Sequence, residues 1–355
     1  MKKILILFSL IIFISCSNDD DFSAPENQEV ENPENPNPEN PTIDLSQNFG
    51  DEVSRDFIGQ IIDADHNPIQ EVSIHIGNSS STTDENGIFI IKEANVHENF
   101  AYITASKSGY INGSRALVPT EGTNELSIML LEKNTTATVN SGSAETVSLA
   151  NGAAVDLAGN YQDSEGNDYS GSVKVSMHHL NPYDEDMFNQ MPGMLYAANT
   201  ENEERMLQTF GMLAVELEGA NGESLNLAEG STATIHVPLS AELLAQAPAT
   251  IPLWHFDEEK GYWVEDGEAT LQGNEYVGTV SHFSFWNCDI PAEAVNYCLT
   301  ITDENNIPLS QVRVTISSEE YGTTSGITNG DGEVCGLIPS GETLEINFYT
   351  NGACS

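Results

Sequence analysis

The sequence predicts an all-β protein in which tandem small β-sandwich modules flank a larger β-rich middle domain. From Arg55 onward, short runs of alternating apolar and polar residues are separated by Gly, Asn and Asp, a pattern typical of half-buried strands joined by turns. One similar set of spaced motifs occurs near residue 60 and again near residue 300, which indicates modular construction. The only fair helix candidate is 240–247, where Ser240 is a suitable N-cap residue.

The first module is expected over residues 55–132. A strand ends in Asp63 and leads into a turn that Pro68 closes. We interpret 84–87 as a hairpin turn in which Gly87 takes a positive φ, after which Phe89 returns to the core. Further strands are predicted at 72–76, 101–105 and 125–130.

These motifs resemble the carboxypeptidase regulatory-like domain, which is a transthyretin-like or immunoglobulin-like β-sandwich. The resemblance implies a sandwich of two sheets. Because this domain is the non-catalytic appendage of zinc carboxypeptidases, it also implies that the module has no enzymatic activity. The matching motifs are Asp63, Pro68-Ile69, Val72-Ser73-Ile74, Thr83-Asp84 with Gly87 and Phe89, and Lys107-Ser108-Gly109-Tyr110.

A second copy of these motifs is expected over residues 294–355. Asp303 and Pro308 are separated by five positions, as Asp63 and Pro68 are, and the run 328–334 corresponds to 83–89. In this alignment Gly352 corresponds to Gly109, so the copy stops before the counterpart of strand 125–130. Either disulfides substitute for that strand or the sequence is a fragment, and we favour the fragment because sheets usually cover their edges.

Residues 134–290 form the predicted middle domain. We expect Trp254, Trp263 and Trp286 in its core, because each lies among apolar strand residues. The order of Met191-Pro192-Gly193, the run 211–215 and the run 252–257 resembles the β-rich ectodomain segment of animal cartilage intermediate layer proteins. Strands are predicted within 173–177, 211–217, 233–238, 251–256, 261–264 and 281–286.

Residues 1–15 are predicted to be a signal peptide, because Lys2 and Lys3 precede an apolar run too short to span a membrane. Cys16 resembles the lipidated cysteine of bacterial lipoproteins. The acidic run 19–21 resembles the signal of Bacteroidetes-type surface lipoproteins. The resemblance implies lipidation of Cys16 and an outer-membrane anchor facing the cell exterior. The alternative is an ordinary signal peptide with a chance cysteine.

Residues 16–51 are predicted to be an extended linker. The unit Pro-Glu-Asn recurs at 25–27, 33–35 and 38–40, and the segment has acidic residues but no Lys or Arg before Asp51. Charge repulsion and proline both extend such a chain, and few apolar residues are available to bury.

The charge excludes one class of partner. The full sequence has 11 Lys+Arg and 55 Asp+Glu, and removing Lys2 and Lys3 with the signal leaves 9 − 55 = −46. Such a chain repels nucleic acid and anionic lipid headgroups. The expected contact with a membrane is therefore through the lipid at the N-terminus.

Apart from Cys16, the four cysteines all lie in the last part of the chain, which favours disulfides outside the cytoplasm. Three connectivities are possible. In the repeat register, Cys298 and Cys335 share the face opposite to Leu299, so we predict that they pair and that Cys288 pairs with Cys354. A zinc site is the alternative, although the sequence has no C-x-x-C pair and no histidine between Cys288 and Cys354.

Catalytic patterns are weak. The only His-x-x-Glu is His255 with Glu258, followed by His282, and its position favours a hairpin turn over a zinc peptidase site. His178 and His179 are adjacent, so on a strand they point to opposite faces. Nucleophile-elbow and phosphate-loop motifs are absent from the sequence. We therefore predict that the protein is not an enzyme and needs no cofactor, with calcium as the one possible ion.

The weak calcium candidates are Asp63, Asp65, Asp84 and Asn86, because oxygen ligands in turns suit this ion. The alternative is that these residues simply form turns.

The sequence thus predicts a non-catalytic surface lipoprotein that binds or scaffolds an extracellular protein or glycan, for example in adhesion. The alternative is an accessory substrate-binding subunit of an outer-membrane polysaccharide or nutrient-uptake system. The expected contact surfaces are the loops 78–86 and 184–205, the latter being long and polar.

Overall fold

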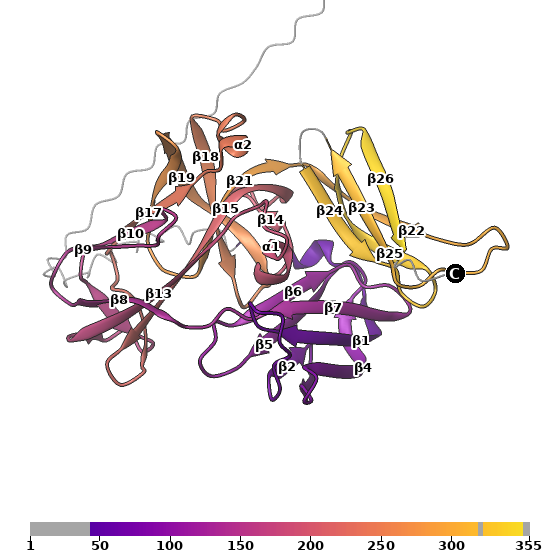
Figure 1. Ribbon diagram of the computed structural model, residues 1–355, viewed down its shortest axis with the longest axis horizontal. Helices are drawn as coiled ribbons and strands as arrows, with labels where there is room; N and C mark the ends of the chain where they lie inside the picture. Colours follow the sequence, from indigo (N-terminus) through magenta and orange to yellow (C-terminus); the bar gives the residue numbers. More distant parts are fainter. Residues whose placement is uncertain (1–42, 319–321, 351–355) are drawn as a thin grey trace, which may run out of the picture. The chain divides into compact units, whose positions relative to one another are not determined.

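The computed structural model describes residues 43–318 and 322–350, and these residues form the all-β architecture that the sequence predicts (Figure 1). Strands β1 to β7 make the first module, β8 to β21 the middle domain and β22 to β26 the second module. Among the described residues, no helix is long and apolar enough to cross a membrane.

The first module is a sandwich of two sheets. One sheet has the order β4-β1-β7, in which β4 runs antiparallel and β7 parallel to β1, and the other has the order β3-β2-β5-β6. Alternate residues of these strands enclose one core that includes Phe57, Ile61 and Ile128. The strands are β1 Glu52–Ile62, β2 Ser73–Ile76, β3 Ser79–Thr82, β4 Ile88–His97, β5 Ala101–Ser106, β6 Gly113–Leu117 and β7 Thr123–Met129.

The turn at 84–87 differs from the hairpin that was expected. Gly87 has a positive φ of 71°, as predicted, but the flanking strands β3 and β4 belong to different sheets. The turn therefore carries the chain from one layer of the sandwich to the other. Sequence pattern identifies such a turn but not which sheet each flanking strand joins.

The middle domain is a sheet of 14 strands, with the path β12-β11-β16-β15-β21-β18-β19-β20-β17-β10-β9 and with β8, β13 and β14 attached to it. Its bounds are β8 Thr135–Asn140, β9 Glu145–Ser148, β10 Ala154–Leu157, β11 Tyr161–Asp163, β12 Asp168–Tyr169, β13 Ser172–Leu180, β14 Tyr196–Ala198, β15 Glu204–Gly219, β16 Ser224–Leu227, β17 Ala233–Pro238, β18 Thr250–Asp257, β19 Tyr262–Gln272, β20 Glu275–Val280 and β21 Phe285–Ala292.

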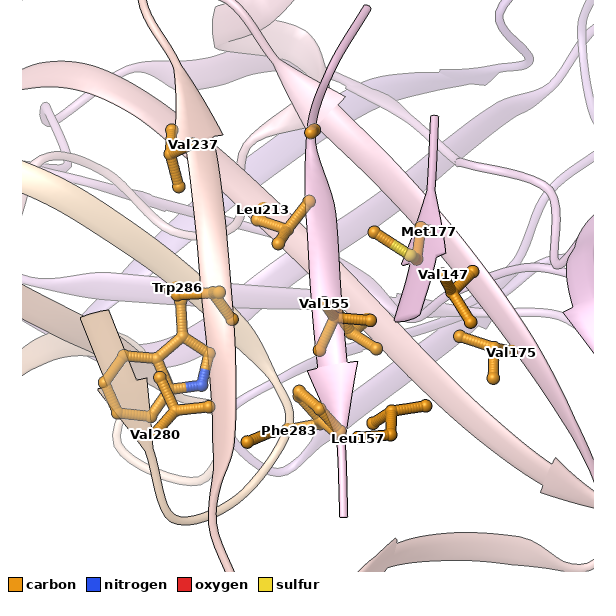
Figure 2. Packing of buried hydrophobic residues seen from close by; sticks show 14 of the residues in the cluster. Val147, Val155, Leu157, Val175, Met177, Leu213, Val237, Val280, Phe283 and Trp286 are labelled. Atoms are coloured by element: carbon orange, nitrogen blue, oxygen red, sulfur yellow. The ribbon is translucent and has the colours of Figure 1, made fainter. Parts of the chain in front are cut away.

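Apolar side chains of this sheet form a large core, part of which is shown in Figure 2 with Trp286, Val280 and Val155. Trp254, Trp263 and Trp286 are all buried, as predicted. The predicted helix is present but short: α2 spans Ala241–Leu244, and the hydroxyl of Ser240 accepts a hydrogen bond from the Leu243 N–H.

The second module consists of a two-stranded sheet, β22-β25, and a three-stranded sheet, β24-β23-β26. All its pairs are antiparallel. The strands are β22 Ala294–Thr300, β23 Val312–Ser318, β24 Gly322–Ile327, β25 Glu333–Pro339 and β26 Leu344–Thr350 (Figure 1).

The linker predicted to reach residue 51 is shorter than expected. Leu45 is fully buried and Phe49 is nearly so, and both pack in a cluster with Phe100, Tyr196 and Tyr262. The short 3₁₀ helix η1, Ser46–Asn48, separates the two side chains. The only sequence signal for this packing was the presence of two apolar residues, Leu45 and Phe49, in an otherwise polar segment.

Candidate functional site

One threonine in each of the two modules makes the same pair of hydrogen bonds to the backbone. The hydroxyl of Thr83 accepts a hydrogen bond from the Val72 N–H, at 2.9 Å, and donates one to the Ile69 carbonyl, at 2.7 Å. Thr328 repeats both bonds with its own partners, Val312 and Leu309, at 3.0 and 2.6 Å. The repeat inferred from spacing is therefore a structural repeat.

Glycine marks the same place in both copies. Gly87 and Gly332 have φ values of 71° and 73°, and a Cβ atom on either would lie 2.4 Å from a backbone carbonyl oxygen, that of Ile61 or Ile301. Only glycine fits both the backbone conformation and the close approach. The two turns are also held in the same way, because the carbonyl of Gly87 accepts a hydrogen bond from the Ile61 N–H and that of Gly332 accepts one from the Ile301 N–H.

The calcium candidates act as turn residues. The Oδ1 atom of Asp63 accepts hydrogen bonds from the N–H groups of Asp65 and Asn67, and Oδ1 of Asp84 accepts them from Asn86 and Ile88. The N–H of Ile88 holds the pKa of the Asp84 carboxyl below its ordinary value. The described part of the chain contains no group of three or more His, Cys, Asp or Glu side chains placed to hold a metal ion.

The same turn occurs at Asp163, Asn199, Asp303 and Asn329, each of which accepts hydrogen bonds from the backbone two and four residues later. The residue three positions after each has a positive φ. Asparagine serves as well as aspartate, so the side-chain oxygen and not the charge is what these turns require.

The described strands of the second module correspond to five of the seven strands of the first. The pairing registers align β22, β23, β24, β25 and β26 with β1, β2, β3, β4 and β5. No described strand of the second module corresponds to β6 or β7. Among the described strands, β22 pairs with β25, whereas β1 lies between β4 and β7.

Two side chains of the second module that correspond to inward residues of the first are exposed. Tyr297 corresponds to Phe57 and is 37% exposed, while Phe57 is fully buried. Phe348 corresponds to Ala105 by the strand register and is 53% exposed. Tyr297 also lines a cavity of about 50 Å³, together with Leu299, Val314, Ile316 and Val334 among others. An apolar core that reaches solvent is the feature a binding site for apolar groups requires.

Further apolar side chains of the same module are exposed. In the repeat alignment, Val295 stands where the first module has Arg55, Ile307 where it has Asn67, and Ile327 where it has Thr82. These three are between 44% and 58% exposed. The second module therefore has six exposed apolar side chains, which are called its apolar surface here: Val295, Tyr297, Ile307, Ile327, Phe348 and Tyr349. They lie on more than one face of the module, because Phe348 and Tyr349 are adjacent on β26 and so point to opposite faces of its sheet.

The predicted bond between Cys298 and Cys335 is present and joins β22 to β25. The complementary pairing is corrected: Cys288 is a free thiol, because it is 1% exposed and its side chain belongs to the core of the middle domain. Burial raises the pKa of this thiol. Cys354 and Cys16, the predicted lipidation site, lie outside the described residues.

The structure brings two of the three residues of the weak peptidase pattern together. The rings of His255 and His282 lie edge to face, with centroids 4.6 Å apart, and both pack against Trp286. Burial, with the neighbouring His282, lowers the pKa of His255 to about 4. Glu258 has different neighbours. Burial, with the nearby carboxylate of Glu216, raises the pKa of its carboxyl, and Asn112 and Lys133 act in the opposite direction.

The adjacent histidines also have separate partners. His178 Nε2 lies 2.7 Å from the carbonyl oxygen of Glu132, whereas His179 Nδ1 lies 3.1 Å from Nδ2 of Asn151. They face different neighbours, as expected on a strand.

The two loops predicted to make contacts contain regular structure, and their role in contacts stays a prediction. The segment 184–205 contains helix α1, Met187–Gln190, and strand β14, and its Met187 and Met191 are buried in a core cluster. The segment 78–86 contains strand β3. Met187 and Met191 are four residues apart, a helical spacing that could have identified the buried face. The apolar surface of the second module was missed, although the repeat alignment contained its signal.

Comparisons with known proteins leave the function open. No protein-family model matches the chain, and no curated protein does. Similar solved structures include the Bacillus anthracis TIE protein (TM-score 0.20, 10% identity, 83% of this chain) and BcpA, the major pilin subunit of Bacillus cereus (TM-score 0.18, 8% identity, 85% of this chain and 90% of that one). This chain spans 45% of the length of the TIE protein.

A membrane-associated protein of unknown function from Bacteroides fragilis is also similar, with a TM-score of 0.20, 9% identity, and coverage of 68% of this chain and 99% of that one. TM-scores at this level do not support a transfer of function.

Proposed function

We propose that this chain is a non-catalytic binding protein of the cell surface, which holds a partner protein through the apolar surface of its second module. One observation carries the proposal. Eight large hydrophobic side chains are exposed in the described residues, and six of them belong to the second module. Scattered exposed apolar residues are ordinary, but their concentration in one small module is typical of an interaction site.

The module is built to present this surface in a fixed form. The disulfide between Cys298 and Cys335 joins its shorter sheet, and Thr328 ties the start of β23 to the preceding turn. The side chain of Gln311 donates a hydrogen bond to Glu125, and that of Asn329 donates one to Thr120 of the first module, at 2.6 Å. Preorganisation of this kind lowers the entropy cost of binding.

Anchoring is the second part of the proposal. Lipidation of Cys16 would fix the chain to the outer membrane, and the acidic segment 17–42 would serve as a spacer. Incorporation of a palmitate analogue into the wild type but not into Cys16→Ala tests the lipid. Loss of the wild-type ectodomain when protease is added to whole cells tests the orientation, and an unlabelled, protease-resistant wild type would contradict this part.

The binding role is tested by photo-crosslinking on intact cells. A photoreactive residue at position 348 should give an adduct of one discrete mass, because Phe348 lies in the apolar surface. The matched control is position 90, since Ile90 is 56% exposed but belongs to the first module. Adducts of the same kind from both positions, or none from position 348, would contradict the proposal.

A further inference from the structure

Three polar side chains lie together inside the middle domain, on the paired strands β15 and β21. Thr209 is 8% exposed and Asn287 and Asp289 are fully buried; Asp289 is the only Asp or Glu among the buried residues that the structure describes. In the strand pairing Thr209 lies directly opposite Asp289. Asn287 is two residues before Asp289 on β21, so both point to the same face. A buried carboxyl is costly, and its presence calls for a structural or a chemical reason.

Hydrogen bonds connect the three groups in a row. The hydroxyl of Thr209 donates to Oδ1 of Asn287, at 2.7 Å, and Nδ2 of Asn287 donates to Oδ2 of Asp289, at 2.5 Å. Because a C=O bond is about 1.2 Å long, the hydroxyl oxygen lies within about 4 Å of the carbonyl carbon Cγ of Asn287. An alcohol and an amide carbon are therefore close together, and a carboxyl contacts the nitrogen of that amide.

An irregularity in β15 positions the Thr209 hydroxyl. The pairing register shifts between Thr209 and Met212, which face Asp289 and Asn287, so β15 has one residue more than β21 over this stretch. The N–H of Gly211, within the irregularity, donates a hydrogen bond to the Thr209 hydroxyl, at 3.1 Å. This bond occupies one lone pair of the hydroxyl oxygen and leaves its proton directed at Asn287.

The surroundings keep Asp289 protonated. Asn287 faces Trp254 of β18 across the sheet, and Trp254 is fully buried in an apolar cluster. Burial raises the pKa of the Asp289 carboxyl well above its ordinary value, and the hydrogen bond from Asn287 opposes this only in part. Such a carboxyl is a neutral acid with a proton to give. Its other oxygen, Oδ1, is buried and has no hydrogen-bond partner among the described residues, so it can accept a proton.

We propose that an ester bond joins Thr209 to Asn287, formed when the Thr209 hydroxyl attacks the side-chain amide of Asn287 while Asp289 transfers the proton. Oγ1 of Thr209 bonds to Cγ of Asn287, and the hydroxyl proton passes to Oδ1 of Asp289. Oδ2 of Asp289 gives its proton to Nδ2, the bond between Cγ and Nδ2 breaks, and ammonia leaves. An alcohol and an amide become an ester and ammonia. Asp289 ends as the neutral acid it was, and no group is oxidised or reduced.

The ester links two strands that lie side by side in the large sheet. It closes a loop that contains β16 to β20, and so it limits the conformations of the unfolded middle domain as a disulfide does. Its buried position keeps water from the bond. This inference goes beyond the proposed function and does not depend on it.

The test is mass spectrometry of the whole mature chain after denaturation and digestion. Cleavage after glutamate releases Thr209 in peptide 205–216 and Asn287 in peptide 276–293. Digestion at mildly acidic pH preserves an ester. The wild type should give the two peptides as one species, with their summed mass less one ammonia, and fragmentation should locate the link at Thr209 and Asn287. Separate peptides with Asn287 intact would overturn the proposal.

Variants at position 209 distinguish the ester from a cyclic imide, which also releases ammonia. Thr209→Val keeps the shape of the side chain without the hydroxyl and should give separate peptides of unchanged Asn287. Thr209→Ser keeps the hydroxyl and should restore the linked species. Loss of ammonia confined to peptide 276–293, in the wild type or in Thr209→Val, would assign the reaction to the backbone beside Asn287 and overturn the ester.

The role of Asp289 is tested by Asp289→Ala, because an asparagine there would offer a second amide. Removing an acid–base group slows such a step by about a hundredfold or more, so the linked fraction at equal times after synthesis should be far below that of the wild type. Circular dichroism establishes that this variant is folded. A folded Asp289→Ala that is linked as completely as the wild type would show that Asp289 does not transfer the proton. The wild type decides the bond itself, whatever the folding of the variants.

Discussion

Cys298 and Cys335 lie directly opposite each other on β22 and β25 and are joined by a disulfide. In the first module the corresponding residues are Ile58 and Ile90, which also face each other across β1 and β4. The bond therefore replaces an ordinary cross-strand pair. It links the two described strands of this sheet covalently.

Removing this bond should destabilise the second module in particular. For a closed loop of 37 residues, the chain-entropy model gives a loss of about 3–4 kcal/mol in the free energy of unfolding. We expect Cys298→Ser with Cys335→Ser to unfold the second module at lower denaturant concentration while the first module is unchanged, as read by residue-resolved amide exchange. Treatment of the wild type with a reductant is the control, and an unaltered second module would contradict the expectation.

The threonine that links turn and strand should contribute equally to the free energy of unfolding in both modules. Thr83→Val keeps the shape of the side chain but leaves the Val72 N–H and the Ile69 carbonyl without their partner. We expect a loss of about 1–3 kcal/mol in the free energy of unfolding, and the same for Thr328→Val. Thr82→Val, at an exposed neighbouring position, is the control and should be close to neutral. A Thr83 variant as stable as the control would show that these bonds contribute nothing.

Substitutions at Gly109 and Gly87 can distinguish the cost of a strained backbone conformation from the cost of a steric clash. Gly109 has a φ of 89° with no atom within 4 Å of an added Cβ, so Gly109→Ala should cost only about 1–2 kcal/mol in the free energy of unfolding. Gly87→Ala carries a similar strain and also meets the Ile61 carbonyl oxygen at 2.4 Å. Denaturant unfolding should show a clearly larger loss for Gly87→Ala, whereas equal losses would indicate that the backbone moves away without cost.

Acid should weaken the middle domain through His255. Its pKa of about 4 in the folded chain lies below its ordinary value of 6.5, so between these values the unfolded chain binds a proton that the folded chain does not. The free energy of unfolding is then unaffected by this group above pH 6.5 and falls as the pH is lowered towards 4. The slope approaches a factor of about ten in the unfolding constant per pH unit.

The variant His255→Phe removes this group but keeps a ring against Trp286. Its unfolding free energy should fall less between pH 6.5 and 4 than that of the wild type, measured in the same denaturant series. The exposed His75→Gln serves as the control. If the His255 variant and the wild type lose stability in parallel over this range, His255 is not the responsible group.

Local chemistry explains what the sequence could predict. The spacing of Asp63, Pro68 and Gly87 defines turns whose hydrogen bonds depend on neighbouring residues only, and the same spacing identified the second copy. Alternation along a strand then placed Cys298 and Cys335 on one face. These inferences needed no knowledge of distant parts of the chain.

Long-range packing explains what it could not predict. The sheet to which β3 belongs depends on partners elsewhere in the chain, and the burial of Leu45 depends on a pocket formed by residues such as Tyr196 and Tyr262. Phe348 is 53% exposed, whereas an apolar residue in a strand pattern normally indicates a core position. The alternation of residues along this strand gave no reason to expect an exposed phenylalanine.

The central claim is that the exposed apolar side chains of the second module contact a partner protein, and the most direct test is photo-crosslinking on intact cells from position 348, with position 90 as the control. The account predicts an adduct of one discrete mass from position 348 and no adduct of that mass from position 90. The same adduct from both positions, or none from position 348, would contradict the account.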